Sequence, residues 1–265
     1  MSPGLAIAVR VGAAAAVFIT MALWEWRAPR RKLVTGRRPR WPGNLGIWLV
    51  DAAVVRLLGP VTVVGAALYA AGRGWGLFNW VVFPPWLAVV LGVIALDLTI
   101  YAQHVAFHYV PWLWRLHRVH HADLDIDVTT GVRFHPVEIA LSILIKIVAV
   151  VALGVPAVAV VAFEVLLNAT SMFNHGNVAL PPAIEPIARW LVVTPQMHQI
   201  HHSIERAETN SNFGFNLPWW DRLFGTYRAT PRAGEHDIVV GIPIFRDVAE
   251  SRIWRLLTQP FRAER

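Results

Sequence analysis

The sequence predicts an all-α fold: a polytopic membrane domain with about four transmembrane helices or hairpin arms and a histidine-rich cap on the cytoplasmic side. Apolar residues make up 55% of the 265 residues, charged residues 15%, and the mean hydropathy is +0.47. This composition is typical of integral membrane proteins. Several apolar stretches also reach the ~20 residues that a helix needs to span the hydrocarbon core. A water-soluble enzyme is therefore excluded as the simplest interpretation.

The chain contains no cysteine. Disulfides, thiolate zinc sites, cysteine-ligated iron–sulfur clusters and cysteine nucleophiles are therefore excluded. Any chemistry of this protein must use other side chains.

The net charge of +7, from 24 basic and 17 acidic residues, originates in one segment. Without the basic residues of that segment the two signs balance, 17 against 17. The charge therefore predicts a topology signal and no nucleic-acid partner. The seven residues are Arg27, Arg30, Arg31, Lys32, Arg37, Arg38 and Arg40.

The first predicted span covers Gly4 to Trp24, and only Arg10 interrupts it near its start. A cleaved signal peptide is the alternative. The stretch ends in Trp24-Glu25-Trp26, however, and not in the small residues that suit cleavage. We therefore expect a helix that remains as a membrane anchor.

Two further spans are predicted at residues 44–71 and at residues 81 to about 103. The second of these has Pro84 and Pro85 in its first turn, where a helix tolerates proline. The polar exceptions within the two spans are Asp51, Arg56 and Asp97.

The apolar block Val137 to Phe173 is long enough for more than one crossing, but Gly154 and Pro156 interrupt its middle. These two residues predict a helical hairpin rather than one long helix. Each arm would have fewer than 20 residues. Such arms could tilt, thin the bilayer or enter it without fully spanning.

The basic segment at residues 25–43 sets the predicted orientation. Because positively charged loops stay in the cytoplasm, we expect the N-terminus outside, and residues 104–136 and everything after residue 174 on the cytoplasmic face. Tryptophans are expected at both membrane interfaces. They are Trp24, Trp26 and Trp41 beside the basic segment, and Trp75 and Trp80 at the opposite end.

We expect a single membrane domain over residues 1–265, because no repeat, low-complexity tract or linker divides the chain. Residues 1–80 would form the N-terminal helices and the basic loop, and residues 81–228 the histidine-rich core. Residues 229–265 are punctuated by proline and glycine and would pack as a cap.

Eight of the 11 histidines fall into three clusters with spacings H-x3-H, H-x2-H-H and H-x2-H-H. On a helix, residues three and four apart lie on one face, about 5–6 Å apart at Cβ, so each cluster can direct its imidazoles at a common point. A lone histidine is more often a hydrogen-bonded or solvated side chain. Eight at this spacing, on one predicted side of the membrane, indicate metal ligands. They are His104 and His108; His117, His120 and His121; and His198, His201 and His202.

Eight imidazoles exceed what one ion accepts, since zinc takes four ligands and octahedral metals six. The sequence therefore predicts two ions. Neutral imidazole suits iron, copper, nickel and zinc, so ligand type does not choose among them. The zinc-protease pattern H-E-x-x-H and the paired E-x-x-H motifs of soluble di-iron bundles are both missing.

Asp97 and Tyr101 share a helical face with His104 and His108 in the third predicted span. A carboxylate at membrane depth is costly unless it has a partner. The partner of Asp97 is either an imidazole whose second nitrogen needs an acceptor or a group on a neighbouring helix. Further candidate acceptors for imidazole are Asp123, Asp125 and Asp127.

From about residue 90 to residue 228, the order of these motifs resembles the fatty acid hydroxylase and sterol desaturase superfamily. The resemblance rests on the three histidine clusters, on a later histidine and on the segment after the last cluster. These additional matches are Asn174-His175-Gly176-Asn177, Asn212-Phe213-Gly214 and Trp220-Asp221-Arg222-Leu223-Phe224-Gly225-Thr226.

The resemblance implies a non-haem di-iron site in the membrane that uses O2 to hydroxylate or desaturate a lipid. The eight clustered histidines would be iron ligands, with His175 as a ninth. Asn174 and His135 would contact the ligands or the substrate, although His135 could equally cap the helix that begins at Pro136. Two iron ions are the implied cofactor, and zinc could take their place in the purified protein.

The family's fatty acid 2-hydroxylases often carry a fused cytochrome b5 domain. This sequence has no H-P-G-G segment of that kind. We therefore expect electrons from a separate donor, a ferredoxin or a cytochrome b5-type protein with its reductase.

Two other classes of function stay open. A membrane zinc- or iron-binding or transport protein would need polar residues along a whole span, whereas these clusters stop at one surface. A haem cytochrome would need axial histidines that face each other across helices. The motifs leave undecided whether the product is hydroxylated or desaturated. They also do not choose among an acyl chain, a sterol-like ring, a carotenoid, an ether lipid and an aminolipid as substrate.

Overall fold

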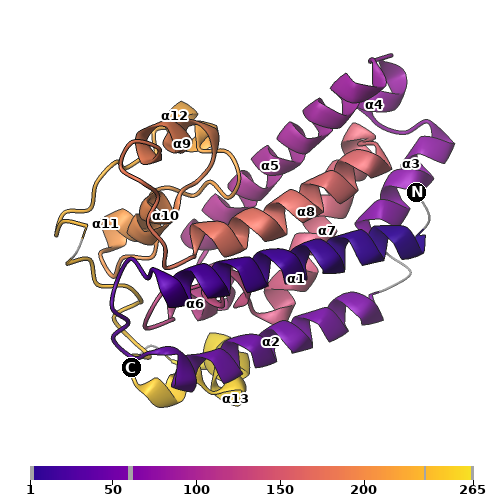
Figure 1. Ribbon diagram of the computed structural model, residues 1–265. Helices are drawn as coiled ribbons and strands as arrows, with labels where there is room; N and C mark the ends of the chain where they lie inside the picture. Colours follow the sequence, from indigo (N-terminus) through magenta and orange to yellow (C-terminus); the bar gives the residue numbers. More distant parts are fainter. Residues whose placement is uncertain (1–2, 59–61, 236, 264–265) are drawn as a thin grey trace.

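The computed structural model describes residues 3–58, 62–235 and 237–263. It confirms the all-α fold class: 67% of the chain is helical and no strand occurs among the described residues. Figure 1 shows the long helices side by side, with the short helices α9 to α12 gathered at one end of the bundle. The histidine clusters belong to this end.

Four helices in the described part of the chain are long and apolar enough to cross a membrane. They confirm the first span, the span after the double proline and both arms of the hairpin. Less than half of each apolar stretch is buried inside the protein, from 6% in the first helix to 39% in the last. Their outer faces therefore suit contact with lipid. The helices are α1 (Pro3–Arg27), α5 (Pro85–Tyr109), α7 (Pro136–Leu153) and α8 (Ala157–Asn174).

The hairpin between α7 and α8 turns where the sequence predicts. Gly154 follows α7 with a φ of 72°, a left-handed conformation that favours glycine. A Cβ on Gly154 would also lie 2.6 Å from the carbonyl oxygen of Trp75. Pro156 then occupies the N-cap of α8. Each arm has 18 residues, which confirms the prediction of fewer than 20 residues per arm.

The second predicted span, residues 44–71, is wrong as one continuous helix. The structure has α2 (Arg37–Leu57) and α3 (Val63–Arg73) instead, with Gly59 and Pro60 outside the described residues. Proline removes a backbone donor and disfavours helical geometry in the residue before it. Thr62 then caps α3, because its Oγ1 accepts the N–H of Gly65 at 2.9 Å.

The basic segment is partly helical rather than a loop, because α1 continues to Arg27 and α2 begins at Arg37. Arg40 is fully buried within α2 and donates to Asp123 and Asp127 at 2.6–2.7 Å. Burial by itself would raise the pKa of Asp123, but Arg40 and Arg133 hold it well below its usual value. Arg40 is therefore an internal ion-pair partner and does not belong to a solvated charge patch.

A charged pair explains the arginine inside the first span. Arg10 donates to Glu164 of α8 at 2.5 Å, and both side chains are partly buried. Pairing lowers the cost of ionised groups at membrane depth. The pair also joins α1 to the second arm of the hairpin.

The apolar core lies between α3, α5, α7 and α8, where Leu96, Val160 and Phe163 are fully buried. The C-terminal segment packs against α2 and α6 through Ile47, Val119 and Leu256. Its elements are η2 (Val248–Ser251), α13 (Ile253–Thr258) and η3 (Gln259–Phe261), and the other short helices are α4 (Leu77–Trp80), α6 (Pro111–His121), η1 (Thr130–Val132), α9 (Glu185–Leu191), α10 (Pro195–His201), α11 (Arg206–Thr209) and α12 (Trp219–Leu223).

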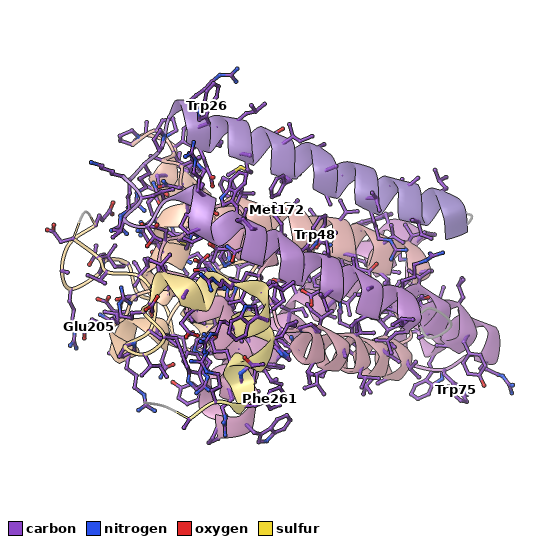
Figure 2. All side chains as sticks on the ribbon, turned by 90° about the horizontal axis from the view of Figure 1, so that it is seen from below. Trp26, Trp48, Trp75, Met172, Glu205 and Phe261 are labelled. Atoms are coloured by element: carbon purple, nitrogen blue, oxygen red, sulfur yellow. The ribbon has the colours of Figure 1, made fainter. Side chains whose placement is uncertain are left out.

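Exposed tryptophans lie at both ends of the bundle. Figure 2 shows Trp26 near the end that carries the short helices and Trp75 at the opposite end. Their exposed fractions are 69% and 48%. This placement agrees with the enrichment of tryptophan at the two membrane–water interfaces.

Candidate metal centre

The C-terminal ends of four helices present the histidines at one end of the bundle. α5 ends at Tyr109, Val110 is extended, and Pro111 begins α6 at a position where a helix tolerates proline. α10 starts in the same way, with Pro195 at its first position and the hydroxyl of Thr194 as its cap. The clusters therefore occupy the last turns of α5, α6 and α10, and His175 follows the last residue of α8.

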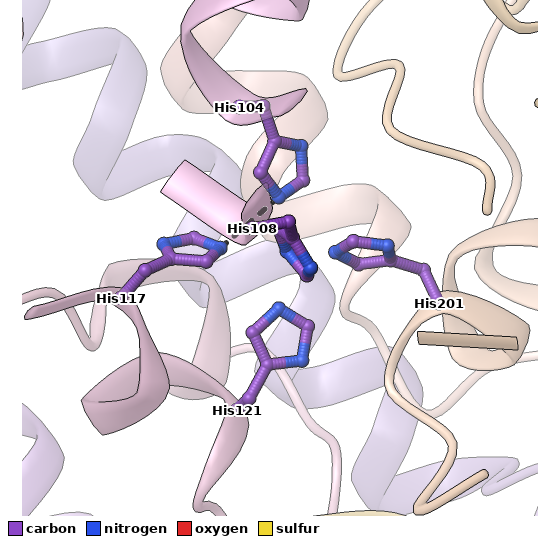
Figure 3. Close-up of side chains that lie close together, drawn as sticks. All are labelled: His104, His108, His117, His121 and His201. Carbon is purple, nitrogen blue, oxygen red and sulfur yellow. Dashed lines mark hydrogen bonds between the residues drawn. The ribbon is translucent and has the colours of Figure 1, made fainter. Parts of the chain in front are cut away.

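The structure brings together all nine histidines that the sequence singled out as ligands, and it divides them into two groups. Within each group the candidate ligand atoms lie within 4.8 Å of one another, and every residue is buried. Figure 3 shows the rings of the first group converging on one point. The five-histidine group consists of His104, His108, His117, His121 and His201, and the four-histidine group of His120, His175, His198 and His202.

Each H-x2-H-H cluster is shared between the two groups, which differs from the expectation that one cluster serves one point. On α6, His117 and His121 are four residues apart and join the five-histidine group, whereas His120 joins the other group. At α10, His198 and His202 are again four apart and share a group, and His201 crosses over. Residues four apart lie most nearly on one helical face, so the third histidine points to the adjacent position.

His175 is central to the four-histidine group. Its Nε2 lies 3.0 Å from Nε2 of His120, 3.1 Å from that of His202 and 3.0 Å from that of His198. Two nitrogens that each lie about 2.1 Å from one ion are about 3 Å apart when the ligand–metal–ligand angle is near 90°. The spacing of these nitrogens therefore suits ligands of a common ion.

Unpartnered nitrogens support the same interpretation in the five-histidine group. Nε2 of His108, His121 and His201 is buried and has no hydrogen-bond partner among the described residues. Leaving a buried polar atom unsatisfied costs about 1–3 kcal/mol. A metal ion would satisfy these lone pairs, so the residues fit such a cofactor.

The outer nitrogens of six histidines face acceptors, which orients each Nε2 toward the centre of its group. Metal-bound imidazoles commonly donate their second N–H in this way. A carbonyl or carboxylate oxygen can only accept, so Nδ1 carries the proton. The Nδ1 acceptors are Phe213 O for His104 (2.7 Å), Asn210 Oδ1 for His108 (3.2 Å), Glu138 Oε1 for His117 (2.6 Å), Arg133 O for His120 (3.1 Å), Ser171 O for His175 (2.6 Å) and Ser211 O for His201 (2.8 Å).

Burial keeps these imidazoles neutral. It lowers the pKa of His117 to about 3 and that of His175 to about 4, because the low-dielectric interior disfavours the imidazolium ion. A neutral imidazole has a free lone pair, and binding a metal does not require it to lose a proton first. The site can therefore accept a cation over the whole physiological pH range.

Asp97 does not contact an imidazole, which decides the question that the sequence left open. It accepts from the side chains of Asn216 (2.8 Å) and Trp220 (2.8 Å) and from the backbone N–H of Leu217 (3.2 Å). Tyr101 shares a hydrogen bond of 2.9 Å with Thr226. Both side chains therefore hold the segment that follows the last histidine cluster.

The prediction that Asp123, Asp125 and Asp127 orient imidazoles is wrong. Asp123 and Asp127 bind Arg40, and Asp125 accepts backbone N–H groups from residues 34–36. The two carboxylates that bind Arg40 are not free for histidine, because α2 places the buried guanidinium of Arg40 against the loop after α6. The acceptors that do serve the histidines are mostly backbone carbonyls, which have no sequence signature.

His135 and Asn174 lie outside both groups. Nδ1 of His135 accepts the N–H of Val137 at 3.2 Å, so the residue caps α7, and its Nε2 donates to the carbonyl of Leu257 at 3.1 Å. The capping alternative for His135 is therefore the one that the structure supports. Asn174 donates to the carbonyl of Phe215 at 3.0 Å.

Two phenylalanine side chains of the bundle core contact the histidines. The ring of Phe134 stacks on His120 with centroids 4.4 Å apart, and Phe215 lies 4.9 Å from His104. Both phenylalanines also pack in the core cluster between the long helices. The histidine groups therefore adjoin an apolar interior directly.

Comparison with known proteins gives a family and several relatives. A family model described as fatty acid hydroxylase matches residues 89–226, slightly more than half of the chain. Ornithine lipid hydroxylase OlsE of Rhizobium tropici is 30% identical over 156 residues, which cover 59% of this chain and 46% of that protein. The alkylglycerol monooxygenase of Xenopus tropicalis is 25% identical over 209 residues, which cover 77% and 43%.

The cholesterol 25-hydroxylase of Rattus norvegicus is 24% identical over 149 residues, which cover 55% of this chain and 48% of that protein. The chain thus spans less than half the length of each of these relatives. No solved structure matches it.

Proposed function

Because the chain belongs to the fatty acid hydroxylase family, we propose that it is a membrane-bound oxygenase that hydroxylates or desaturates a C–H bond of a lipid. The cofactor would be two iron ions, one in each histidine group. The observation that carries the proposal is the pair of buried histidine groups at the end of an apolar helical bundle. The named relatives act on lipids, which supports a lipid substrate.

When bound, a pair of iron ions can activate O2 for attack on an unactivated C–H bond. Hydroxylation consumes one O2, two electrons and two protons and yields an alcohol and one water. Desaturation consumes the same reagents, removes two hydrogens from the lipid and yields two waters. Both need an external electron donor, and a ferredoxin or a cytochrome b5-type protein with its reductase would supply the electrons.

The chain's own residues would hold the ions, orient the imidazoles and exclude water. All nine histidines are buried, which shields the reacting atoms from solvent. Glu138 and the backbone carbonyls fix the outer nitrogens, and so the direction of each lone pair. A lipid tail would approach from the apolar side of the site, past Phe134 and Phe215.

We treat residues 1–265 as one membrane domain in which residues 81–228 contain the site. The site would face the cytoplasm, because residues 28–36 link α1 to α2 at the same end of the bundle and carry basic side chains. A hydrophilic electron donor could then reach the histidine end from the cytoplasm.

The proposal is tested by comparing the lipids of host cells with and without this protein, in air and at low oxygen. The expected result is an oxygen-dependent lipid that has gained one oxygen atom or lost two hydrogens, together with two irons per purified chain. If His201→Ala leaves both the bound metal and the product unchanged, the proposal fails. Metal uptake by vesicles without any lipid product would instead support the transport alternative.

A cysteine-free chain allows a direct test of orientation. We expect a membrane-impermeant thiol reagent to label Arg73→Cys in intact cells and to leave Glu205→Cys unlabelled until the membrane is opened. Both side chains are exposed, and they lie near opposite ends of the bundle, as the positions of Trp75 and Glu205 in Figure 2 illustrate. The opposite labelling pattern would place the histidine site outside the cytoplasm.

A further inference from the structure

The segment after the last histidine cluster, residues 210–228, contributes no residue to either histidine group. Its first four residues supply acceptors to three of the five histidines in the five-histidine group. These acceptors are the side-chain oxygen of Asn210 and the carbonyls of Ser211 and Phe213. This short stretch of chain therefore sets the orientation of most of that group.

The stretch has an unusual backbone that must be held in place. Asn212 adopts a φ of 51°, in the left-handed region that a residue other than glycine rarely occupies. Its side chain donates to the carbonyls of Met197 and Arg228 and accepts the N–H of Arg228. The left-handed residue lies directly between the two carbonyls that face His201 and His104.

A single buried carboxylate fixes the other end of the stretch. Asp221 has no exposed surface, and its two oxygens accept the N–H groups of Phe213 at 2.7 Å and Gly214 at 2.8 Å. The Phe213–Gly214 turn has little room for alternatives, because a Cβ on Gly214 would lie 2.9 Å from the Asp221 carboxylate. The residue whose N–H binds Asp221 is thus the same residue whose carbonyl binds His104.

Hydrogen bonds also connect Asp221 to α5, the helix that carries His104. Thr226 donates to the Asp221 carboxylate at 2.7 Å, and its hydroxyl also lies 2.9 Å from the hydroxyl of Tyr101. Tyr101 lies three residues before His104 on α5. The path from α5 through Tyr101, Thr226, Asp221 and Phe213 therefore returns to His104 and fixes its ring against its own helix.

We propose that Asp221 is the positioning residue of the five-histidine group: it holds the Phe213 carbonyl where His104 needs its acceptor, and thereby sets the affinity of that group for its ion. The inference rests on the proposed function, since it requires that the group bind a metal. No hydrogen bond joins Asp221 to an imidazole among the described residues; its carboxylate accepts from the backbone N–H groups of Phe213 and Gly214 and from the hydroxyl of Thr226.

The test uses the full-length protein, stripped of metal and titrated with Co2+, whose visible absorption reports the number and arrangement of its ligands. Asp221→Asn keeps the size of the side chain but puts an amide donor where two carboxylate oxygens accept. We expect the affinity of the five-histidine group for Co2+ to fall by about 10–100-fold, which is the usual cost of losing an outer partner of a metal-bound imidazole. The affinity of the four-histidine group should not change.

Combining Asp221→Asn with the replacement of histidine ligands shows which of the two histidine groups loses its affinity for Co2+. His175→Ala removes the central ligand of the four-histidine group and leaves the five-histidine group complete, so the single remaining ion should weaken when Asp221→Asn is added. The double replacement His108→Ala with His121→Ala removes two ligands of the five-histidine group and leaves the four-histidine group complete, and in that protein Asp221→Asn should change nothing. Thr226→Val removes one donor to Asp221 and should give the same selective loss in smaller size, which also provides the test if Asp221→Asn does not fold.

Asp125→Asn is the matched control, because Asp125 also is buried and accepts backbone N–H groups, from residues 34–36, but reaches no histidine. It should leave both Co2+ affinities and the absorption spectrum unchanged. Equal weakening of both ions by Asp221→Asn, or the same effect from Asp125→Asn, would overturn the inference and leave the proposed function intact. An unsubstituted protein that binds no Co2+ would contradict the proposed function and the inference together.

Discussion

Replacing His175 with alanine is expected to leave one tightly bound ion per chain in place of two and to abolish lipid oxidation. Nε2 of His175 lies 3.0–3.1 Å from Nε2 of His120, His198 and His202, so its ring contacts every other member of the four-histidine group. Losing an outer partner of a metal-bound imidazole already costs about 10–100-fold in affinity or activity, and losing a ligand should cost more. Elemental analysis of the purified protein and lipid mass spectrometry measure the two effects.

His135→Ala is the matched control for this prediction. His135 is also buried, but it caps α7 and belongs to neither histidine group. Its replacement should cost about 0.5–2 kcal/mol of stability through the lost cap, while both ions stay bound. Equal metal loss in the two variants would show that general unfolding, rather than ligation, explains the result.

Helix geometry made the gathering of the clustered histidines at one end of the bundle predictable from the sequence. Histidines three and four apart must project from one side of a helix, and three such clusters on one predicted side of the membrane left little choice about where they meet. The hairpin was equally visible, because Gly154 and Pro156 interrupt an apolar block too long for one crossing. The spacing of the histidines and the positions of glycine and proline were sufficient to predict these features.

Features that depend on tertiary contacts were not predictable in the same way. The split of His117 and His121 from His120 depends on how α6 is rotated against its neighbours. The acceptors of His104, His120, His175 and His201 are backbone carbonyls, which every residue has. Glu138 is a candidate acceptor that the sequence does show, because it is the single acidic residue of α7 and lies in the first turn of that mostly apolar helix.

The sequence interpretation of the basic segment as a loop is wrong at Arg40, because the burial of that residue depends on tertiary contacts. Seven basic residues in one stretch resemble a solvated loop, yet one of them turns inward once α2 forms. The sequence offered one indication, since Asp123, Asp125 and Asp127 alternate in the next polar segment and could pair with an arginine. From the sequence we predict that these carboxylates accept from histidine, and the structure contradicts this because Asp123 and Asp127 accept from Arg40.

Arg40→Met is expected to destabilise the protein by about 3–5 kcal/mol, because it leaves the buried Asp123 and Asp127 without their main cation. Nε and Nη2 of Arg40 donate to both oxygens of Asp123 at 2.6 and 2.7 Å, and Nη1 donates to Asp127 at 2.7 Å. Arg133 lies 3.3 Å from Asp123 and can compensate only in part. Thermal unfolding in detergent should show a lower apparent Tm, by roughly 2–4 °C per kcal/mol.

Arg38→Met separates this ion-pair effect from the loss of a positive charge. Arg38 lies two residues before Arg40 on α2 but is exposed, so its replacement should change stability by no more than about 0.5 kcal/mol. Removing the carboxylates as well, in Arg40→Met with Asp123→Asn and Asp127→Asn, should recover part of the lost stability, because no unpaired charge then stays buried. If Arg40→Met and Arg38→Met unfold at the same temperature, the buried ion pairs do not hold α2 to the loop after α6.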